Sequence, residues 1–476
     1  MSDVRTLHSY ARSVLKRRGV KVYPGLSEVI RSDALAILGQ DVDFARVFQR
    51  REDDNPLIEF YSKRKRYYDD HYGFCSIVYA AVRKFEENPD SIPTYDLVLV
   101  DEFQDFNKLE VSLIDLLASK SPVLIAGDDD QALYEFKHAS AEFLRSRFDA
   151  SSDEYESFTL PYCSRCPEVV IDAANDLIGN AKAKGHLSDR ISKSYKYFAC
   201  KAKDDVGRNY PRIVHAQRHS NQISSFVLQQ LSKVAAVEKA QFSCLVIAPS
   251  QEIRRRVSDA LLAKGLRSCE RFEKRTDEDV QLWRALKLLL KDKDSNLGWR
   301  LAAERVLGTS QFNKALMASD GLDCGPFKDL LDVTTRKMIK SLRATCRSIR
   351  DKGEAKPDSL THLQDALKVD PSTLKLNHIS RELHKGAAHL NVQGLAKIPI
   401  RVTTIPGSKG LDADFVFLVH FDDRFFLTKN RVTDQDICNF LVCMTRARKR
   451  LFLVSVNRSA SPTFLDWMDQ DRIERV

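Results

Sequence analysis

YDLVLVDEFQDF, residues 95–106, is the stretch of sequence that decides the fold. Its first half is a short run rich in apolar and β-branched residues, and it ends abruptly in the acidic pair Asp101 and Glu102, as a buried parallel strand does at its carboxyl edge. Leucines at helical spacing follow over 109–117, and a second apolar run closes in acids, VLIAGDDD at 123–130. The stretch therefore predicts a strand-helix-strand unit whose carboxylates gather where α/β proteins bind ligands.

The same alternation returns further along the chain. Strand-like runs lie at 242–250, 400–404, 414–419 and 451–456, whereas 285–395 has a helical pattern with few strand runs. We therefore expect an α/β fold with a second parallel sheet and a mainly helical insertion.

Length and composition bound the class of protein. With 476 residues, 43% apolar and 30% charged, the chain predicts a globular protein of two to four domains. The N-terminus lacks the apolar core of a secretory signal, and the apolar runs fall far short of the roughly 20 residues that span a bilayer. We expect a cytoplasmic protein with no membrane partner.

Ten cysteines are scattered along the chain, as in a reducing compartment. Cys163 and Cys166 form a CxxC, but no second pair stands at zinc-site spacing. Buried core thiols are the expectation for these cysteines, with a metal site as the alternative.

The positive charge is concentrated in one segment. The chain carries a net charge of +9, and residues 284–385 hold 20 Lys and Arg against 13 Asp and Glu. A helix there would have Ile339, Leu342, Cys346 and Ile349 on one face and a basic stripe on the other, formed by Arg336, Lys340, Arg343, Arg347 and Arg350. Such a stripe suits a nucleic-acid backbone, and a solvated charged face is the alternative.

The first acidic cluster has the residues that nucleotide hydrolysis needs. One acid of the pair Asp101 and Glu102 would hold Mg²⁺, and its neighbour would orient or deprotonate water. In GDDDQALYEF, residues 127–136, Gln131 is suited to sense a phosphate. Tyr134 and Phe136 offer faces for base stacking, or else belong to a core.

Five motifs in order carry a resemblance. DEFQD (101–105), GDDDQALYEF (127–136), LPYCSRCPEVVIDAANDLI (160–178), TTIPGSKGLDADFVFL (403–418) and LVCMTRARKRLFLV (441–454) resemble successive signatures of superfamily 1 DNA helicases of the UvrD/Rep/PcrA type. HSYARSVL (8–15) resembles the segment that precedes the family's inserted DNA-binding subdomain.

The resemblance implies an ATP-dependent motor that moves 3′ to 5′ on single-stranded DNA and acts at single-strand/double-strand junctions. ATP and Mg²⁺ would be its cofactors. Asp101 would bind Mg²⁺, Glu102 would activate the attacking water, and Gln131 would couple the γ-phosphate to DNA. Arg165 and Arg446 would stabilise the charge of the transition state.

Two further motifs receive roles from the resemblance. In the turn-rich loop PGSKGLD, residues Lys409, Gly410 and Asp412 would contact nucleotide, although a simple connecting loop is the alternative. The family has histidine where this chain has Pro406, and glutamate in place of Asp412. The residues expected to face DNA are His8, Tyr134, Phe136, Lys137, Thr404, Arg343 and Arg347.

Arg446 has a second interpretation from its own segment. Ile437, Phe440, Leu441 and Met444 form an apolar stripe at helical spacing, which predicts Arg446 on the opposite face. A lone arginine there would be a solvated surface residue, whereas its place among the five ordered motifs favours the functional role.

The resemblance also implies a domain layout of two RecA-like domains with helical insertions. The expected segments are a remnant of the first RecA-like domain (1–10), a helical insertion (11–90), the incomplete first RecA-like domain (91–157), the first part of the second (158–283), a basic helical insertion (284–395) and the rest of the second (396–476).

One element of such a motor is missing from the sequence. None of the 18 glycines is followed by lysine, so no GxxxxGK(S/T) phosphate-binding loop occurs. We expect an N-terminally truncated motor, a degraded homologue, or half of a split motor whose partner protein supplies this loop. A non-catalytic DNA-binding or regulatory subunit is the rival function.

Overall fold

The computed structural model describes residues 4–15, 20–133, 137–148, 154–238, 242–266, 277–320, 326–352, 355–367, 398–428, 431–456 and 460–476. The chain divides into two compact units. Unit 1 comprises residues 1–99, 107–124 and 273–382, and unit 2 comprises 100–106, 125–272 and 383–476.

Unit 2 is built on a six-stranded parallel sheet with strand order β10-β5-β9-β8-β6-β7. The strands are β5 (Ile213–Gln217), β6 (Cys244–Ala248), β7 (Ile400–Thr404), β8 (Ala413–Val419), β9 (Ala447–Ser455) and β10 (Ile473–Arg475). Strands β6 to β9 confirm four of the predicted runs, and the α/β class with a parallel sheet is confirmed. The RecA-like character of two domains stays a prediction.

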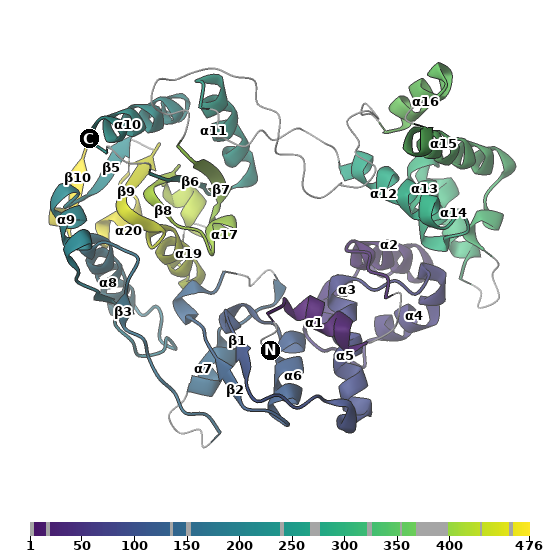
Figure 1. The fold of residues 1–476 in the computed structure, drawn as a ribbon, viewed down its shortest axis with the longest axis horizontal. Coiled ribbons are helices and arrows are strands. Elements are labelled where there is room, and N and C mark those ends of the chain that lie inside the picture. The colour runs from purple at the N-terminus through teal and green to yellow at the C-terminus, as the bar shows by residue number, and fades with distance from the viewer. Residues whose placement is uncertain are drawn as a thin grey trace. The chain divides into compact units, whose positions relative to one another are not determined.

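Helices cover both faces of this sheet (Figure 1). Along β8, Phe415, Phe417 and Val419 pack into one hydrophobic cluster with α10 (Ile223–Val237) and α11 (Gln251–Ala263). Val416 and Leu418 point into a second cluster with α8 (Glu168–Ala183) and α19 (Asp434–Met444). The period of two along the strand therefore divides the core between the two layers.

Shorter elements complete unit 2. Strands β3 (Tyr162–Cys163) and β4 (Lys196–Tyr197) pair in parallel beside the main sheet. The remaining helices are α7 (Glu142–Phe148), α9 (Lys201–Asn209), α17 (Ile405–Ser408), α18 (Asp423–Phe426) and α20 (Thr463–Asp466).

The predicted strand-helix-strand unit is present as β1 (Val98–Val100), α6 (Lys108–Ala118) and β2 (Val123–Ile125). Helix α6 begins at a capping box in which Asn107 and Glu110 satisfy each other's backbone N–H groups. The two strands pair only with each other among the described residues. Leu99 and Leu124, predicted to lie in buried strands, are 69% and 54% exposed because no further described layer covers them.

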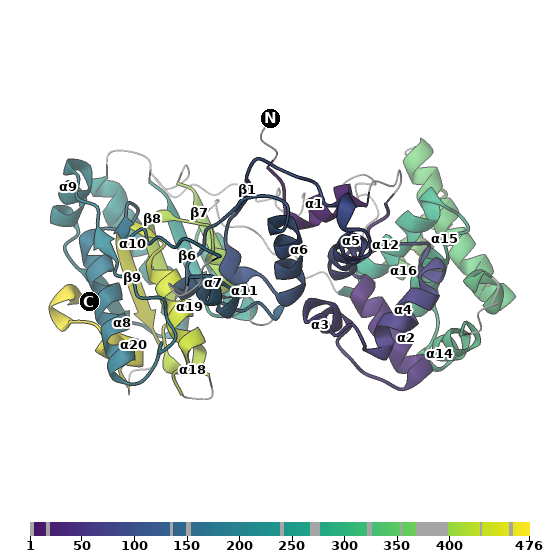
Figure 2. The same ribbon diagram turned by 90° about the horizontal axis from the view of Figure 1, so that it is seen from below.

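Unit 1 is otherwise helical (Figure 2). Its other helices are α1 (Leu7–Val14), α2 (Leu26–Leu38), α3 (Phe44–Gln49), α4 (Pro56–Arg64), α5 (Phe74–Glu87), α12 (Asp277–Lys291), α13 (Asn296–Val306), α14 (Thr309–Ala318), α15 (Val333–Lys352) and α16 (Pro357–Leu367). The basic helix predicted around 336–350 is confirmed as α15, with Ile339, Leu342 and Cys346 buried.

A buried ion-pair network joins the two helical segments that were predicted as separate insertions. Arg300 of α13 donates from Nη2 to Asp33 of α2 at 2.8 Å, and both side chains are fully buried. Arg64 of α4 donates from Nη1 to the carbonyl of Ser319 at 3.0 Å. These segments therefore pack as one compact unit, while the predicted domain boundaries stay a prediction.

The described helices include none that is both long enough and apolar enough to cross a membrane.

Candidate functional site

The acidic pair lies directly after β1. Asp101 and Glu102 are both exposed, and the Asp101 carboxylate accepts a hydrogen bond from the Glu102 backbone N–H at 2.9 Å. Glu102 has a left-handed backbone with φ of 57°, which is uncommon for a residue with a side chain. This sharp turn ends the strand and leaves both carboxylates at the surface, where a cation or a water molecule has access to them.

Gln104 connects the acidic pair to the loop after β2. Its side chain is buried, donates from Nε2 to Glu102 Oε2 at 2.7 Å, and accepts from the Asp128 N–H at 3.0 Å through Oε1. At Gly127 a Cβ atom would stand 2.7 Å from Gln104 Oε1, so glycine leaves room for this amide. Sequence reasoning did not single out Gln104, because a glutamine after two acids carries no signal of its own.

Lys409 binds the two acidic segments together. Its ammonium group donates to Asp105 Oδ2 at 2.6 Å and to the Gln131 carbonyl at 2.8 Å, and it lies 3.4 Å from Glu102 Oε2. Burial raises the pKa of Asp105, although Lys409 acts in the opposite direction. Lys409 was predicted to hold phosphate, and in this structure it holds carboxylates and a carbonyl. The positive φ of Gly410, 72°, makes the turn that follows.

Three consecutive acids, Asp128 to Asp130, form the centre of a buried ion-pair network. Arg190 donates to both oxygens of Asp130 at 2.7 Å. Lys193 contacts all three carboxylates, and Tyr195 donates to Asp130 at 2.6 Å. The carboxylates lie close enough to hold a metal ion, but these cations already neutralise them. Burial raises the pKa of Asp128, yet Lys193 and the hydrogen bonds from Gln131 and the Asp130 N–H together lower it, and the net shift is downward.

This network was not predicted, because its cations come from a polar segment of weak pattern. Arg190 lies 60 positions beyond its partner Asp130 in the sequence, and Tyr195 lies 65 positions beyond it. Only the fold brings that segment against the acidic loop.

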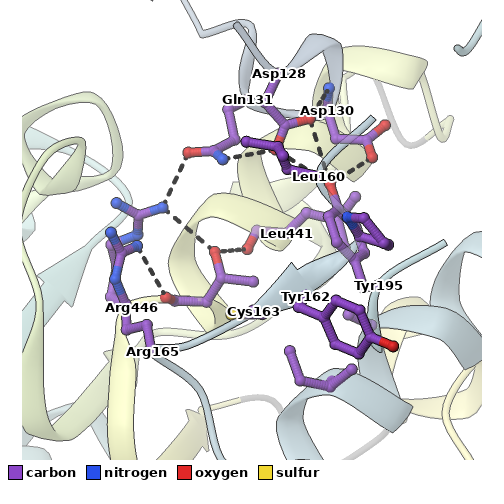
Figure 3. A pocket seen from close by; sticks show the side chains of 14 residues that line it. Asp128, Asp130, Gln131, Leu160, Tyr162, Cys163, Arg165, Tyr195, Leu441 and Arg446 are labelled. Carbon is purple, nitrogen blue, oxygen red and sulfur yellow. Dashed lines mark hydrogen bonds between the residues drawn. The ribbon is translucent and has the colours of Figure 1, made fainter. Parts of the chain in front are cut away.

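Gln131 and Arg446 meet beside this network (Figure 3). Gln131 donates from Nε2 to Asp128 Oδ2 at 2.7 Å, and its Oε1 accepts from Arg446 Nη2 at 3.1 Å. Arg446 also donates from Nε to the Val442 carbonyl at 2.8 Å. The structure therefore brings together two residues, 315 positions apart in sequence, that were predicted to share one site.

The environment of Arg446 corrects the predicted helix face. Helix α19 ends at Met444, so Arg446 lies in the turn before β9, not on the face opposite the apolar stripe. It is 1% exposed, which excludes a solvated surface arginine. Burial and the neighbouring Arg165 lower the pKa of Arg446. Among the described residues no carboxylate lies within ion-pair distance of it, although Glu102 acts to raise its pKa.

Arg165 completes the arginine pair. It donates from Nη1 to the Thr445 carbonyl at 3.5 Å, and its Nε lies 3.7 Å from Asp412, a carboxylate that also faces Arg448 at 3.8 Å. A cavity of about 140 Å³ lies beside the pair and is lined by 14 residues, including Gln131, Arg165 and Arg446. Two guanidinium groups at one cavity favour an anionic ligand such as a phosphate.

Comparisons with known proteins agree with these motifs. A sequence-family model of the UvrD/REP helicase N-terminal domain matches residues 49–150. DNA helicase II of Haemophilus influenzae is 32% identical over 126 residues, 25% of this chain and 16% of that protein. ATP-dependent DNA helicase PcrA of Staphylococcus aureus is 27% identical over 165 residues, 33% of this chain and 22% of that protein.

A longer match covers much of the chain. A probable DNA helicase II homolog of Mycoplasma pneumoniae is 24% identical over 401 residues, 76% of this chain and 54% of that protein. This chain is related to the UvrD/Rep/PcrA-type DNA helicases. It spans about half the length of this relative, and less of the other two.

The residues predicted to face DNA divide between the two units of this chain. Thr404 is buried at the end of β7, and Lys137 is exposed, both in unit 2. Tyr134 and Phe136 lie outside the described residues.

In unit 1, His8 of α1 packs edge-on against Phe74, with ring centroids 5.3 Å apart. Arg343 donates to the Leu289 carbonyl at 2.8 Å, and Arg347 lies 3.5 Å from Asp351. The basic stripe of α15 is therefore partly satisfied within its own unit.

Proposed function

We propose that the chain is the nucleotide-hydrolysing part of an ATP-dependent DNA helicase or translocase, with its phosphate site at the arginine pair Arg165 and Arg446. The observation that carries the proposal is the buried guanidinium of Arg446, which lines a cavity together with Arg165 and forms no ion pair with a described carboxylate. An unpaired buried charge is costly, and a bound phosphate would relieve that cost.

The acidic pair fits the metal and water roles by its exposure. The Asp101 carboxylate is a hard oxygen ligand, as Mg²⁺ prefers, and Glu102 is held in direction by Gln104. When bound, Mg·ATP would supply the γ-phosphoryl group and neutralise part of its charge. Glu102 would then accept the proton of the attacking water, and the two arginines would stabilise the charge on the transferred group.

Gln131 is the proposed link between nucleotide state and DNA. It contacts Arg446 through its side chain and Lys409 through its carbonyl. Lys409 in turn reaches Glu102 and Asp105. A change in the contacts of Arg446 would therefore alter the contacts of both acidic segments. Lys409, Gly410 and Asp412 would contribute to nucleotide contact by moving from their present partners.

Single-stranded DNA, and single-strand/double-strand junctions, are the proposed substrates, with 3′ to 5′ movement. The proposed DNA-facing residues are His8, Tyr134, Phe136, Lys137, Thr404, Arg343 and Arg347. Because lysine and arginine contacts to phosphate release counterions, binding should weaken steeply with salt.

The phosphate-binding loop has to come from outside these 476 residues, since GxxxxGK(S/T) does not occur in them. Exposed leucines in and next to β1 and β2 support a place for it: Leu97, Leu99 and Leu124 are 51%, 69% and 54% exposed. Further strands bearing this loop, in the same polypeptide or in a partner protein, would cover these leucines and pair with the open strand edges.

Measurement of ATP turnover with and without single-stranded oligonucleotide tests the proposal. The assay would use the chain alone and a form joined to an in-frame or partner segment that carries GxxxxGK(S/T). We expect DNA-stimulated turnover in the joined form and a loss of at least about 100-fold in Arg446→Ala. Arg208→Ala, which removes an exposed arginine of α9, is the matched control.

Two results would contradict the proposal. If the joined form shows no ATP turnover either with or without DNA, ATP-driven movement is refuted. Salt-dependent DNA binding without turnover would instead support the rival function, a non-catalytic DNA-binding or regulatory subunit.

A further inference from the structure

A pair of thiols lies against the arginine pair, in the segment CSRC that contains Arg165. Cys163 ends β3, and Cys166 lies two positions before α8, so ordered elements flank the pair on both sides. The Cys163 carbonyl accepts from Lys203 of α9 at 3.1 Å, and Cys166 Sγ donates to the Thr445 carbonyl at 3.3 Å. Both thiols are free in the structure.

The two thiols differ in access and in acidity. Cys163 lines the cavity beside Arg165 and Arg446 (Figure 3), whereas Cys166 is fully buried. The interaction with the neighbouring Cys166 side chain is the main cause that lowers the pKa of Cys163 to about 5. The interaction with Cys163, together with burial, raises the pKa of Cys166 well above its usual value. An accessible thiolate thus stands beside a protonated, shielded partner, the arrangement of a nucleophilic and a resolving cysteine.

The structure gives less support to the two roles expected from sequence. Cys166 is fully buried, as expected of a core thiol, but Cys163 is only partly buried. A metal site needs more ligands, and within the described part of the chain the candidate cluster of ligands consists of Asp128 to Asp130 and does not include these thiols.

We propose that Cys163 and Cys166 are a redox-active dithiol that closes to a disulfide by exchange with a small-molecule disulfide such as oxidised glutathione. The Cys163 thiolate attacks one sulfur of the small disulfide, forms a mixed disulfide and releases one thiolate, which takes up a proton. Cys166 then loses its proton to solvent and attacks the Cys163 sulfur, which expels the second small thiol. Two protein thiols are oxidised and one disulfide is reduced to two thiols.

Closure of this disulfide would act on the arginine pair. Cys166 would lose the S–H group that donates to the Thr445 carbonyl, the same carbonyl that accepts from Arg165. Thr445 directly precedes Arg446, and the ring closed by the Cys163–Cys166 disulfide would include the backbone of Arg165. Oxidation would therefore displace both guanidinium groups from the cavity. This consequence rests on the proposed function, whereas the thiol chemistry does not.

Thiol accounting on the full chain tests the chemistry by itself. The protein would be equilibrated in defined mixtures of oxidised and reduced glutathione, quenched with acid, alkylated and analysed by peptide mass spectrometry. We expect a Cys163–Cys166 disulfide in the wild type and a lasting mixed disulfide at Cys163 in Cys166→Ser. Cys200→Ser, which removes an exposed thiol, should leave the pair unchanged.

Two outcomes would overturn the dithiol. One is that Cys163 and Cys166 stay reduced in a mixture that already modifies Cys200. The other is that wild-type Cys163 keeps the bound glutathione, which would show that Cys166 does not resolve it.

The regulatory consequence has its own measurement. In a form that hydrolyses ATP, oxidation should lower turnover at least tenfold, and a dithiol reductant should restore it. Cys163→Ser should abolish that sensitivity. Disulfide formation with unchanged turnover would refute the regulatory role, while a chain without turnover in every form would refute the proposed function and leave the thiol result standing.

Discussion

Asp130→Ala should destabilise unit 2 strongly, because it leaves the Arg190 guanidinium buried without its carboxylate. Each side chain of this pair is 1% exposed, and Arg190 binds both oxygens of Asp130 at 2.7 Å. Removing one partner of a buried pair costs about 3–5 kcal/mol. We expect the lower end, about 3 kcal/mol, because Arg190 keeps its bond to the Lys193 carbonyl at 2.9 Å.

Hydrogen exchange read by peptide mass spectrometry measures this loss within unit 2. For the slowest amides of β8 and β9, a loss of about 3 kcal/mol is roughly 150-fold faster exchange. Glu252→Ala is the matched control, because its partner Arg256 is 69% exposed and such pairs contribute about 0.5 kcal/mol or less.

A second variant separates burial of charge from loss of packing. Asp130→Ala combined with Arg190→Met removes both charges, and we expect it to recover a large part of the lost stability. A stability of Asp130→Ala within about 1 kcal/mol of the wild type, or a double variant less stable than the single variant, would refute the cost of the buried unpaired charge.

Three further changes follow from single contacts. Burial and then Arg475 lower the pKa of His215 to about 4. The neutral imidazole therefore contributes fully to the free energy of unfolding above about pH 6.5, and up to about 3 kcal/mol of this contribution is lost as the pH falls towards 4. The free energy of unfolding of His215→Gln, measured in urea at several pH values, should lack this slope. In the form joined to a GxxxxGK(S/T) segment, Gly127→Ala should displace Gln104 and lower DNA-stimulated ATP turnover about tenfold with little change in nucleotide affinity. Unchanged turnover counts against the role of Gln104. Lys409→Met leaves Asp105 half-buried and unpaired, which raises its pKa further. The variant should therefore lose stability relative to the wild type as the pH rises from 4 to 7. A difference in urea midpoint between the two proteins that does not change with pH would contradict this.

The local pattern of the sequence predicted most of the scaffold. The runs around β6, β7, β8 and β9 are dense in β-branched and aromatic residues, so their strands could be identified without tertiary information. The amphipathic period of α15 was equally visible. Two strands of the main sheet were missed: β5 has His215 at its centre, and β10 is a three-residue edge strand with charged residues.

For the candidate site, the sequence and the tertiary structure supplied different information. Sequence alone indicated the candidate side chains, because motif order singled out Asp101, Glu102, Gln131, Arg165 and Arg446 and the acid-rich strand ends located the carboxylates. Only the tertiary structure decided the state of those groups, because burial and charge compensation depend on segments far apart in the chain.

Arg446 and Lys409 are two residues whose burial and partners the sequence did not predict. Arg446 was compatible with a solvated helix face until the end of α19 and the surrounding core made it a buried cation. Lys409 was predicted to hold phosphate from its place in a turn-rich loop, yet the fold places it between Asp105 and Gln131. A sequence records the kinds of groups available at a site, whereas the electrostatic free energy of each group is set by the partners and the solvent exposure that folding gives it.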